Sequence, residues 1–342
     1  MAERWLYWLE DLRKEQNDLV GKKCANLGEI AKIGLPIPHG FALSLDAYNL
    51  FMDVTGAAEE MRACIRAHEG ALDSIAGINE LSRELRRIVE SKPVPDEMKS
   101  TILHHYGELC NRCCALDVAV STRSAGAVSH PGQYETHLNV KGDADLLDKI
   151  RKVWSSSFNP TSLSFRKQKG VPLERDPIGV AVLKMVNARS AGIIFTADPN
   201  TADMGRMIIE ANWGLGESVV GGESMPDTYI VDKKTFGVVE RRLGTKLRCV
   251  LPVEKGVCEQ ETPKDKCCSF CLSDEELAEI AKVGIQLEEH FGAPQDVEWA
   301  IDSDLSFPHN LILLQTRNEV MAKKKEPVDQ VLDLMLTRFV KA

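Results

Sequence analysis

No segment of this 342-residue chain is apolar enough to cross a bilayer, which takes about 20 consecutive apolar residues. The longest candidate, Ile178 to Val186, is far shorter and contains Lys184. The N-terminus carries three acidic side chains, Glu3, Glu10 and Asp11, and this charge is wrong for a secretory signal peptide. We therefore expect no membrane partner and a soluble, cytoplasmic protein.

Basic residues are outnumbered by acidic ones, because the chain has 42 Lys and Arg but 51 Asp and Glu, which gives a formal charge of −9. The one basic run that stands out is Lys323 to Lys325. Nucleic-acid-binding domains concentrate Lys and Arg on one face or along one helix. We therefore expect no nucleic-acid partner.

The ten cysteines lack the spacing of a zinc site. Two clusters contain Cys-x-x-Cys pairs: Cys110, Cys113 and Cys114, and Cys267, Cys268 and Cys271. About 150 residues separate them, against roughly 15–20 in typical zinc sites. We expect reduced thiols that pack in the core or lie in loops, with a zinc-stabilised interaction domain as the alternative.

The length predicts about two domains, and the pattern of the chain changes near its middle. The first hundred residues show mostly helical spacing, whereas short apolar runs typical of strands follow from Ile178 onward. Helices followed by mixed strands and helices predict an α+β chain with two lobes, which we place at residues 1–177 and 178–342.

Local signals refine this division. Ser273 to Glu276 form a capping box that opens a helix. The polar, aperiodic segment Leu251 to Cys268 predicts a loop or an excursion from the sheet, and the chain from Glu326 predicts an amphipathic helix that completes the C-terminal end.

The most informative segment is a predicted hairpin near the C-terminus. Residues 296–302 alternate between apolar and acidic side chains, and 311–317 form the matching strand. This pairing places Glu298 opposite Gln315, with Arg317 one pleat away. Carboxylate and amide oxygens suit Mg²⁺, and a guanidinium neutralises phosphate charge. A solvated hairpin with a cross-strand salt bridge is the other interpretation.

Three further segments contain small residues, and two of them also contain cations. Ser121 to Ala127 brings Arg123 to the end of a strand, where small residues let backbone N–H groups approach an anion. Gly21 to Glu29 places two lysines before a short helix, and Ala211 to Glu217 leaves a strand through two glycines. Plain surface loops and a tight turn are the alternatives.

Taken together, these segments resemble the nucleotide-binding part of the phosphoenolpyruvate synthase and pyruvate, phosphate dikinase family, to which rifampicin phosphotransferase and phenylphosphate synthase belong. The matching stretches occur in the family's order and cover nearly the whole chain: Val20–Glu29, Gly34–Phe41, Val118–Val140, Gly179–Pro199, Ala211–Glu217 and Asp296–Arg317.

The resemblance implies a two-lobed ATP-grasp fold with mixed or antiparallel sheets and flanking helices, with ATP and Mg²⁺ held between the lobes. By motif match, the phosphate contacts from the first lobe are Lys23, Arg123, Gly132 and Thr136. Lys184 lies near the adenine, where many members have Gln, and Glu217 belongs to the ATP site. Glu298 and Gln315 match the metal and phosphate positions, and Arg317 matches a phosphate-binding arginine; Arg123, Glu298 and Arg317 are the expected catalytic residues.

Full-length relatives also carry a swivelling domain with a phosphorylatable histidine, and no histidine here lies in such a motif. The resemblance therefore implies a partner subunit that bears this histidine and the acceptor site. The small subunit of phenylphosphate synthase is the nearest match. Such a subunit uses Mg-ATP to phosphorylate the partner's histidine, releases AMP and phosphate, and supports onward transfer to phenol.

Other functions remain open at this point. A split phosphoenolpyruvate synthase or a rifampicin-type phosphotransferase subunit would share the same ATP site, because the acceptor site lies on another chain. A non-catalytic ATP-sensing module is the alternative from a different class.

Overall fold

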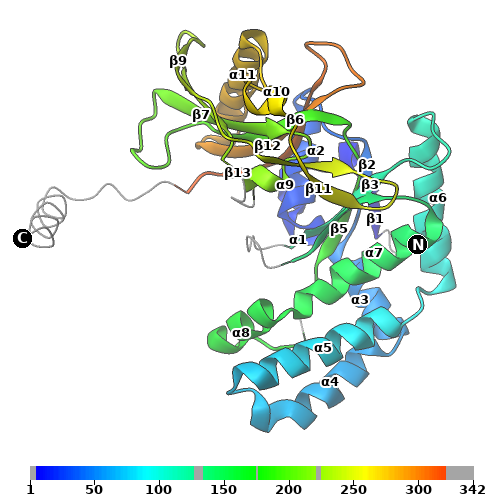
Figure 1. The fold of residues 1–342 in the computed structure, drawn as a ribbon. Coiled ribbons are helices and arrows are strands. Elements are labelled where there is room, and N and C mark those ends of the chain that lie inside the picture. Colours follow the sequence, from blue (N-terminus) through cyan, green and yellow to red (C-terminus); the bar gives the residue numbers. More distant parts are fainter. Residues whose placement is uncertain (1–4, 127–133, 175, 221–224, 321–342) are drawn as a thin grey trace, which may run out of the picture.

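The computed structural model describes residues 5–126, 134–174, 176–220 and 225–320 (Figure 1). Two antiparallel sheets organise the chain, one in each lobe. The first has the order β1-β2-β5-β3-β4: Leu6–Trp8, Gly40–Leu43, Gly179–Lys184, Val120–Ala125 and Thr136–Val140. The second has the order β13-β12-β6-β7-β8-β9: Leu311–Asn318, Gln295–Asp302, Ala188–Phe195, Arg206–Trp213, Asp227–Asp232 and Val238–Arg242.

Helices cover the first sheet and extend beyond it to the lower end of the molecule in Figure 1. In α5, Leu81, Leu85 and Ile88 repeat at helical spacing and are buried in the core of this lobe. The helices of this lobe are α3 (Leu45–Val54), α4 (Ala57–His68), α5 (Ile75–Ser91), α6 (Asp96–Arg112), α7 (Asp143–Ser155) and α8 (Pro160–Lys169). Short 3₁₀ turns are Leu9–Asp11, Lys14–Gln16, Glu69–Ala71 and Ser156–Phe158.

The second sheet packs against α11 (Asp274–Phe291). The predicted capping box is confirmed, because the Ser273 hydroxyl accepts from the Glu276 N–H and the Glu276 carboxylate accepts from the Ser273 N–H. Leu277, Ile280 and Leu287 of this helix are buried in the core of the second lobe.

Helix α2 (Lys22–Lys32), preceded by α1 (Asn17–Val20), joins the two lobes. Cys24, Leu27 and Ile30 of α2 are buried in the same core as the second sheet and α11. The Asn26 side chain donates to the Thr316 carbonyl at 2.9 Å. The N-terminal part of the chain is thus packed against β13.

The structure confirms the predicted α+β class with antiparallel sheets and flanking helices. The change of sheet falls between Lys184 and Ala188 rather than at 177/178, because β5 pairs with β2 and β3 of the first sheet. The predicted helix after Glu326 lies outside the described residues. Among the described helices, none has the length and apolar character that a membrane span requires.

Of the two predictions for Leu251 to Cys268, a plain loop is wrong, and the segment is an excursion with its own secondary structure. This region contains most of a hairpin, β10 (Arg248–Pro252) with β11 (Val257–Glu261), followed by α10 (Lys264–Cys267). Strand β11 is mostly exposed, so it lacks the alternating apolar pattern that marks a half-buried strand. At the hairpin's tip, the Asn139 side chain of β4 donates to the carbonyls of Val253 and Gly256, which connects the hairpin to the first sheet.

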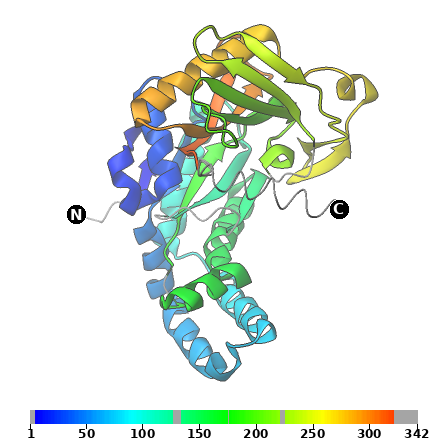
Figure 2. The same ribbon diagram turned by 90° about the vertical axis from the view of Figure 1, so that its left-hand side faces the viewer.

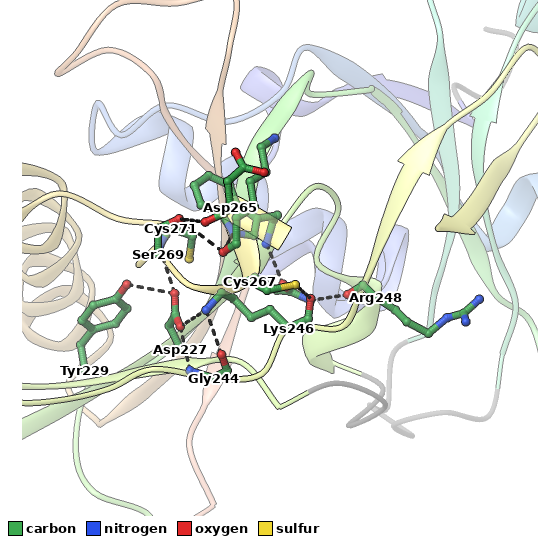
Figure 3. A network of polar contacts seen from close by, with 12 residues as sticks. Asp227, Tyr229, Gly244, Lys246, Arg248, Asp265, Cys267, Ser269 and Cys271 are labelled. Atoms are coloured by element: carbon green, nitrogen blue, oxygen red, sulfur yellow. Dashed lines mark hydrogen bonds and ion pairs between the residues drawn. The ribbon is translucent and has the colours of Figure 1, made fainter. Parts of the chain in front are cut away.

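A buried ion pair fixes the chain that leads into this hairpin (Figure 3). Asp227 and Lys246 have fully buried side chains, and the Lys246 ammonium donates to the Asp227 carboxylate. The same carboxylate accepts from the Gly244 and Cys271 N–H groups, each at 2.9 Å, and from the Tyr229 hydroxyl at 3.4 Å. Because the charges are paired and hydrogen-bonded, their burial is tolerated.

The two predicted cysteine clusters do not meet. Cys110 is buried in the core of the first lobe and Cys271 in the core of the second. In the described part of the chain, no common group of metal ligands includes both clusters. The shared zinc site is therefore wrong, whereas the expected core packing is confirmed for these two thiols.

Candidate functional site

A cavity of about 480 Å³ lies between the two sheets. This is within the usual range for small-molecule sites, roughly 300–1,000 Å³. Both lobes contribute to its walls: Pro38, Ser121, Arg123, Thr136, Leu138, Leu183, Lys184, Met185, Val186, Ala188, Ala191, Gly192, Leu215, Gly216, Glu217, Glu298, Trp299, Ala300 and Leu314. The lining combines an apolar part with a few charged groups, as binding sites for organic ligands do.

The hairpin of β12 and β13 has the predicted register. Glu298 pairs with Gln315, and Asp296 pairs with Arg317. A bulge between Glu298 and Trp299 shifts the register toward the turn. The expected group of a carboxylate, an amide and a guanidinium on one hairpin is therefore confirmed.

Arg123 of β3 reaches across the cavity to this hairpin. Its Nη2 donates to the Glu298 Oε2 at 2.7 Å, and its Nη1 donates to the Leu314 carbonyl at 3.3 Å. Both charged side chains are mostly buried. Burial raises the pKa of Glu298, but the charge and hydrogen bond of Arg123, with the charges of Lys23 and Arg317, hold that pKa below its usual value. Glu298 is therefore ionised at neutral pH.

Lys23 lies beside this pair because of a tight contact at Gly21. Gly21 has φ +80°, and a Cβ on it would lie 2.1 Å from the Ala125 carbonyl oxygen. Lys22 N–H donates to the Gly126 carbonyl at 3.0 Å, which holds the start of α2 against the end of β3. Only glycine combines this conformation with such a close approach.

Burial, followed by the charge of Arg123, lowers the pKa of Lys23 to about 8. The charge of Glu298 opposes this change and that of Arg317 adds to it. The Lys23 ammonium is thus crowded by cations in the free protein. An incoming anion would relieve this repulsion.

Arg317 is oriented by its cross-strand neighbour. Its Nε donates to the Asp296 Oδ2 at 2.7 Å, and its Nη2 forms an ion pair with the same oxygen at 2.6 Å. Burial raises the pKa of Asp296, although Arg317 opposes the change. Arg317 remains partly exposed, so its guanidinium stays accessible to a ligand.

Several buried polar atoms of the site have no hydrogen-bond partner among the described residues: Arg123 Nε, Trp299 Nε1 and Gln315 Oε1. Such groups are expensive to bury unless a ligand or water satisfies them. Gln315 Oε1 and the Glu298 carboxylate lie on paired residues, and both are hard oxygen donors. The donor set therefore fits a cation such as Mg²⁺, which is commonly held by one or two protein oxygens.

Of the remaining predicted residues, Thr136, Lys184 and Glu217 line the cavity, whereas Lys23, Gln315 and Arg317 are not among its lining residues. Thr136 pairs with Arg123 across β3 and β4, and Lys184 ends β5, where its N–H donates to the His39 carbonyl. Both line the cavity, as does Glu217 at the start of α9 (Glu217–Val220). Gly132 lies outside the described residues.

Sequence reasoning missed the apolar walls of the cavity. Leu138, Leu183, Met185 and Val186 line it, and Val186 ends the apolar run that begins at Ile178. That apolar run was the sequence signal from which these walls could have been predicted, because its last residues pass from one sheet to the other. The role of Asp296 in orienting Arg317 was also missed.

The glycines of the segment 211–217 have two different roles. Gly214 has φ +75°, and a Cβ on it would lie 2.4 Å from the Val250 carbonyl oxygen of β10. This glycine therefore serves the close packing of the hairpin. Gly216 lines the cavity, so the backbone at this point can approach a ligand.

Known proteins are similar to this chain in sequence. A protein-family model described as "Pyruvate phosphate dikinase, AMP/ATP-binding domain" matches residues 17–336. A "Probable phosphoenolpyruvate synthase" of Methanocaldococcus jannaschii is 34% identical over 328 residues, which cover 94% of this chain and 27% of that protein. A "Phosphoenolpyruvate synthase" of Aeropyrum pernix is 32% identical over 367 residues, which cover 96% of this chain and 44% of that protein. The chain thus spans less than half the length of these relatives.

Proposed function

Because this chain belongs to the family of the pyruvate phosphate dikinase AMP/ATP-binding domain, we propose that it binds Mg-ATP in the cavity between its sheets and uses it to phosphorylate a histidine on a partner subunit, with release of AMP and phosphate. The observation that carries this proposal is the convergence of Lys23, Arg123 and Arg317 on Glu298 beside an apolar cavity. An apolar part suits the base, and three cations suit the polyphosphate.

Different residues would bind the base and the phosphates of the nucleotide. Leu138, Leu183 and Met185 offer apolar surface to the adenine, and Lys184 offers an ammonium donor at that end. Lys23, Arg123 and Arg317 would neutralise the phosphates. Positioning and charge neutralisation are the main contributions a protein makes to phosphoryl transfer.

Glu298 and Gln315 would hold the magnesium ion, which supplies neutralisation of phosphate charge. In the free protein, Arg123 is held by Glu298. On nucleotide binding, Arg123 would exchange the Glu298 carboxylate for a phosphate oxygen, and the carboxylate would become available as an oxygen ligand. The ion pair thus keeps two oppositely charged groups in place until the ligand arrives.

The partner is proposed from the chemistry of the side chains at the cavity. The charged side chains gathered here are cations and acids suited to ATP, and no described residue that lines the cavity is a histidine that could accept phosphate. The names of the relatives favour pyruvate as the final acceptor. The phenol acceptor of phenylphosphate synthase stays a prediction from the sequence.

The binding half is tested by calorimetric titration of the purified chain with ATP, with and without Mg²⁺. We expect saturable binding that Arg123→Ala and Arg317→Ala abolish. Arg206→Ala is the matched control, because its ion pair with Asp203 is exposed and remote from the cavity lining. Equal affinity in all three variants would contradict the proposed site.

The transfer half is tested with ATP labelled at the β-phosphate. The segment of the Aeropyrum pernix relative that this chain does not cover is supplied as a separate polypeptide, with that relative's own ATP-binding segment as the positive control. We expect AMP and an acid-labile label on the supplied polypeptide only when both chains are present. Pyruvate and phenol are then compared as acceptors of the label. AMP formation at full rate by this chain alone would refute the need for a partner.

A further inference from the structure

A second group of chemically reactive side chains lies in the helical part of the first lobe, away from the cavity. Cys64 and His68 come from α4, and Glu84 comes from α5. These two helices are antiparallel neighbours at the lower end of the molecule in both views (Figures 1 and 2). None of the three residues belongs to the cavity lining.

The ligand atoms of this group are already close together. Cys64 Sγ lies 3.3 Å from Glu84 Oε2, and His68 Nε2 lies 3.9 Å from the same oxygen. One ligand atom from each residue lies within 4.8 Å of the others. Tetrahedral zinc, with bonds of about 2.0–2.3 Å, separates its ligand atoms by roughly 3.3–3.7 Å. Small side-chain adjustments would therefore give metal-binding geometry.

The backbone of α4 fixes the histidine in the required form. His68 Nδ1 lies 2.9 Å from the Cys64 carbonyl oxygen, so Nδ1 carries the proton and donates. The Nε2 lone pair is then directed away from this bond. Metal-ligating histidines have this arrangement, with one ring nitrogen donating to a carbonyl while the other binds the metal. Cys64 and His68 are also one helical turn apart, which places both on the same face.

We propose that Cys64, His68 and Glu84 form a binding site for a borderline-soft divalent cation, zinc foremost. A thiolate, an imidazole and a carboxylate are together a donor set for zinc rather than for Mg²⁺. The three ligands are half-buried, which leaves the fourth position to water. On binding, the Cys64 thiol releases its proton to solvent as the sulfur–metal bond forms.

The state of the thiol agrees with this geometry. Burial, followed by the hydrogen bond and charge of Glu84, raises the pKa of Cys64 to about 11. Without metal, the thiol is therefore protonated and donates to Glu84.

The site would link α4 to α5, which are otherwise joined by a short connection through Glu69–Ala71. A metal ion bound only in the folded state stabilises it by mass action. The cation is thus a structural link in the helical part of the lobe, separate from the Mg²⁺ proposed for the cavity.

The test is a titration of the reduced full chain with Co²⁺, followed by competition with Zn²⁺. We expect one equivalent of Co²⁺ with a thiolate-to-cobalt charge-transfer band that Zn²⁺ removes. Cys64→Ala should lose the band, and His68→Gln and Glu84→Gln should weaken binding by more than about tenfold. Cys258→Ala is the matched control, because this exposed cysteine lies outside the group and should leave the band unchanged.

A second measurement separates loss of the site from loss of the fold. Zinc should raise the Tm of the wild type and of Cys258→Ala but not that of His68→Gln, whose circular dichroism should match the wild type. Absence of the band from the wild type, or its persistence in Cys64→Ala, would overturn the proposal.

Discussion

Lys23 offers a case in which removing a binding residue should stabilise the free protein. Its pKa falls from 10.5 to about 8 on folding, so the folded chain disfavours the charged form by about 2.5 pKa units, or about 3 kcal/mol. Met has nearly the same shape but no charge. We therefore expect Lys23→Met to raise the free energy of unfolding at about pH 7 by up to about 3 kcal/mol.

The sign and the pH range follow from linkage. Below about pH 8, Lys23 is charged in both the folded and the unfolded chain, so the free-energy cost of its charge in the folded chain is fully present. As the pH rises from about 8 toward 10.5, the folded chain loses the proton first and the cost disappears. The advantage of Lys23→Met should therefore shrink over this range.

Urea unfolding at about pH 7 and about pH 10 measures the free energy of unfolding, and calorimetry measures the affinity for Mg-ATP. Stability and ATP affinity should move in opposite directions in Lys23→Met. The reasoning is refuted if the variant is no more stable than the wild type at the lower pH, or if its advantage is the same at both.

Three other perturbations are expected to act as follows. Glu298→Gln should lower AMP formation in the two-polypeptide assay by orders of magnitude with little change in circular dichroism; near-normal turnover would count against its role. Mg-ATP affinity should fall as the pH rises through about 8, since Lys23 then loses its charge, and Lys23→Arg should remove this dependence in calorimetric titrations. Asp227→Asn should lower the free energy of unfolding by roughly 3–5 kcal/mol, because it leaves the buried Lys246 ammonium without a counter-charge; an unchanged urea midpoint would contradict this.

The sequence was most informative where a regular pattern of residues marks one face or one end of a helix or strand. The pairing of Glu298 with Gln315 follows from alternation on two strands, and the structure confirms it. The helix at Asp274 follows from its capping box. In both cases, local physical rules agree with the tertiary packing.

The sequence was least informative where long-range contacts decide. Strand β11 exposes most of its residues and is connected to the first lobe at its tip by Asn139, more than a hundred residues away. The local periodicity of a sequence does not reveal such contacts. The group of Cys64, His68 and Glu84 was missed for a related reason, because Glu84 belongs to a different helix. The placement of Lys23, Arg123 and Glu298 at one site was expected only from family resemblance, since no local pattern joins these segments.

The hairpin of β10 and β11 also bears on how fast nucleotide can leave. In Figure 2, α2 and the hairpin lie on opposite sides of the region between the lobes. Separating the lobes on the hairpin side breaks the two hydrogen bonds from the Asn139 side chain and the one from Gly256 N–H to its carbonyl. At about 1 kcal/mol each, these bonds make the open form roughly a hundredfold rarer than it would be without them. Exchange of AMP for ATP through this side should therefore be slowed by the same factor. Asn139→Ala should accelerate product release without changing any of the groups proposed to bind phosphate.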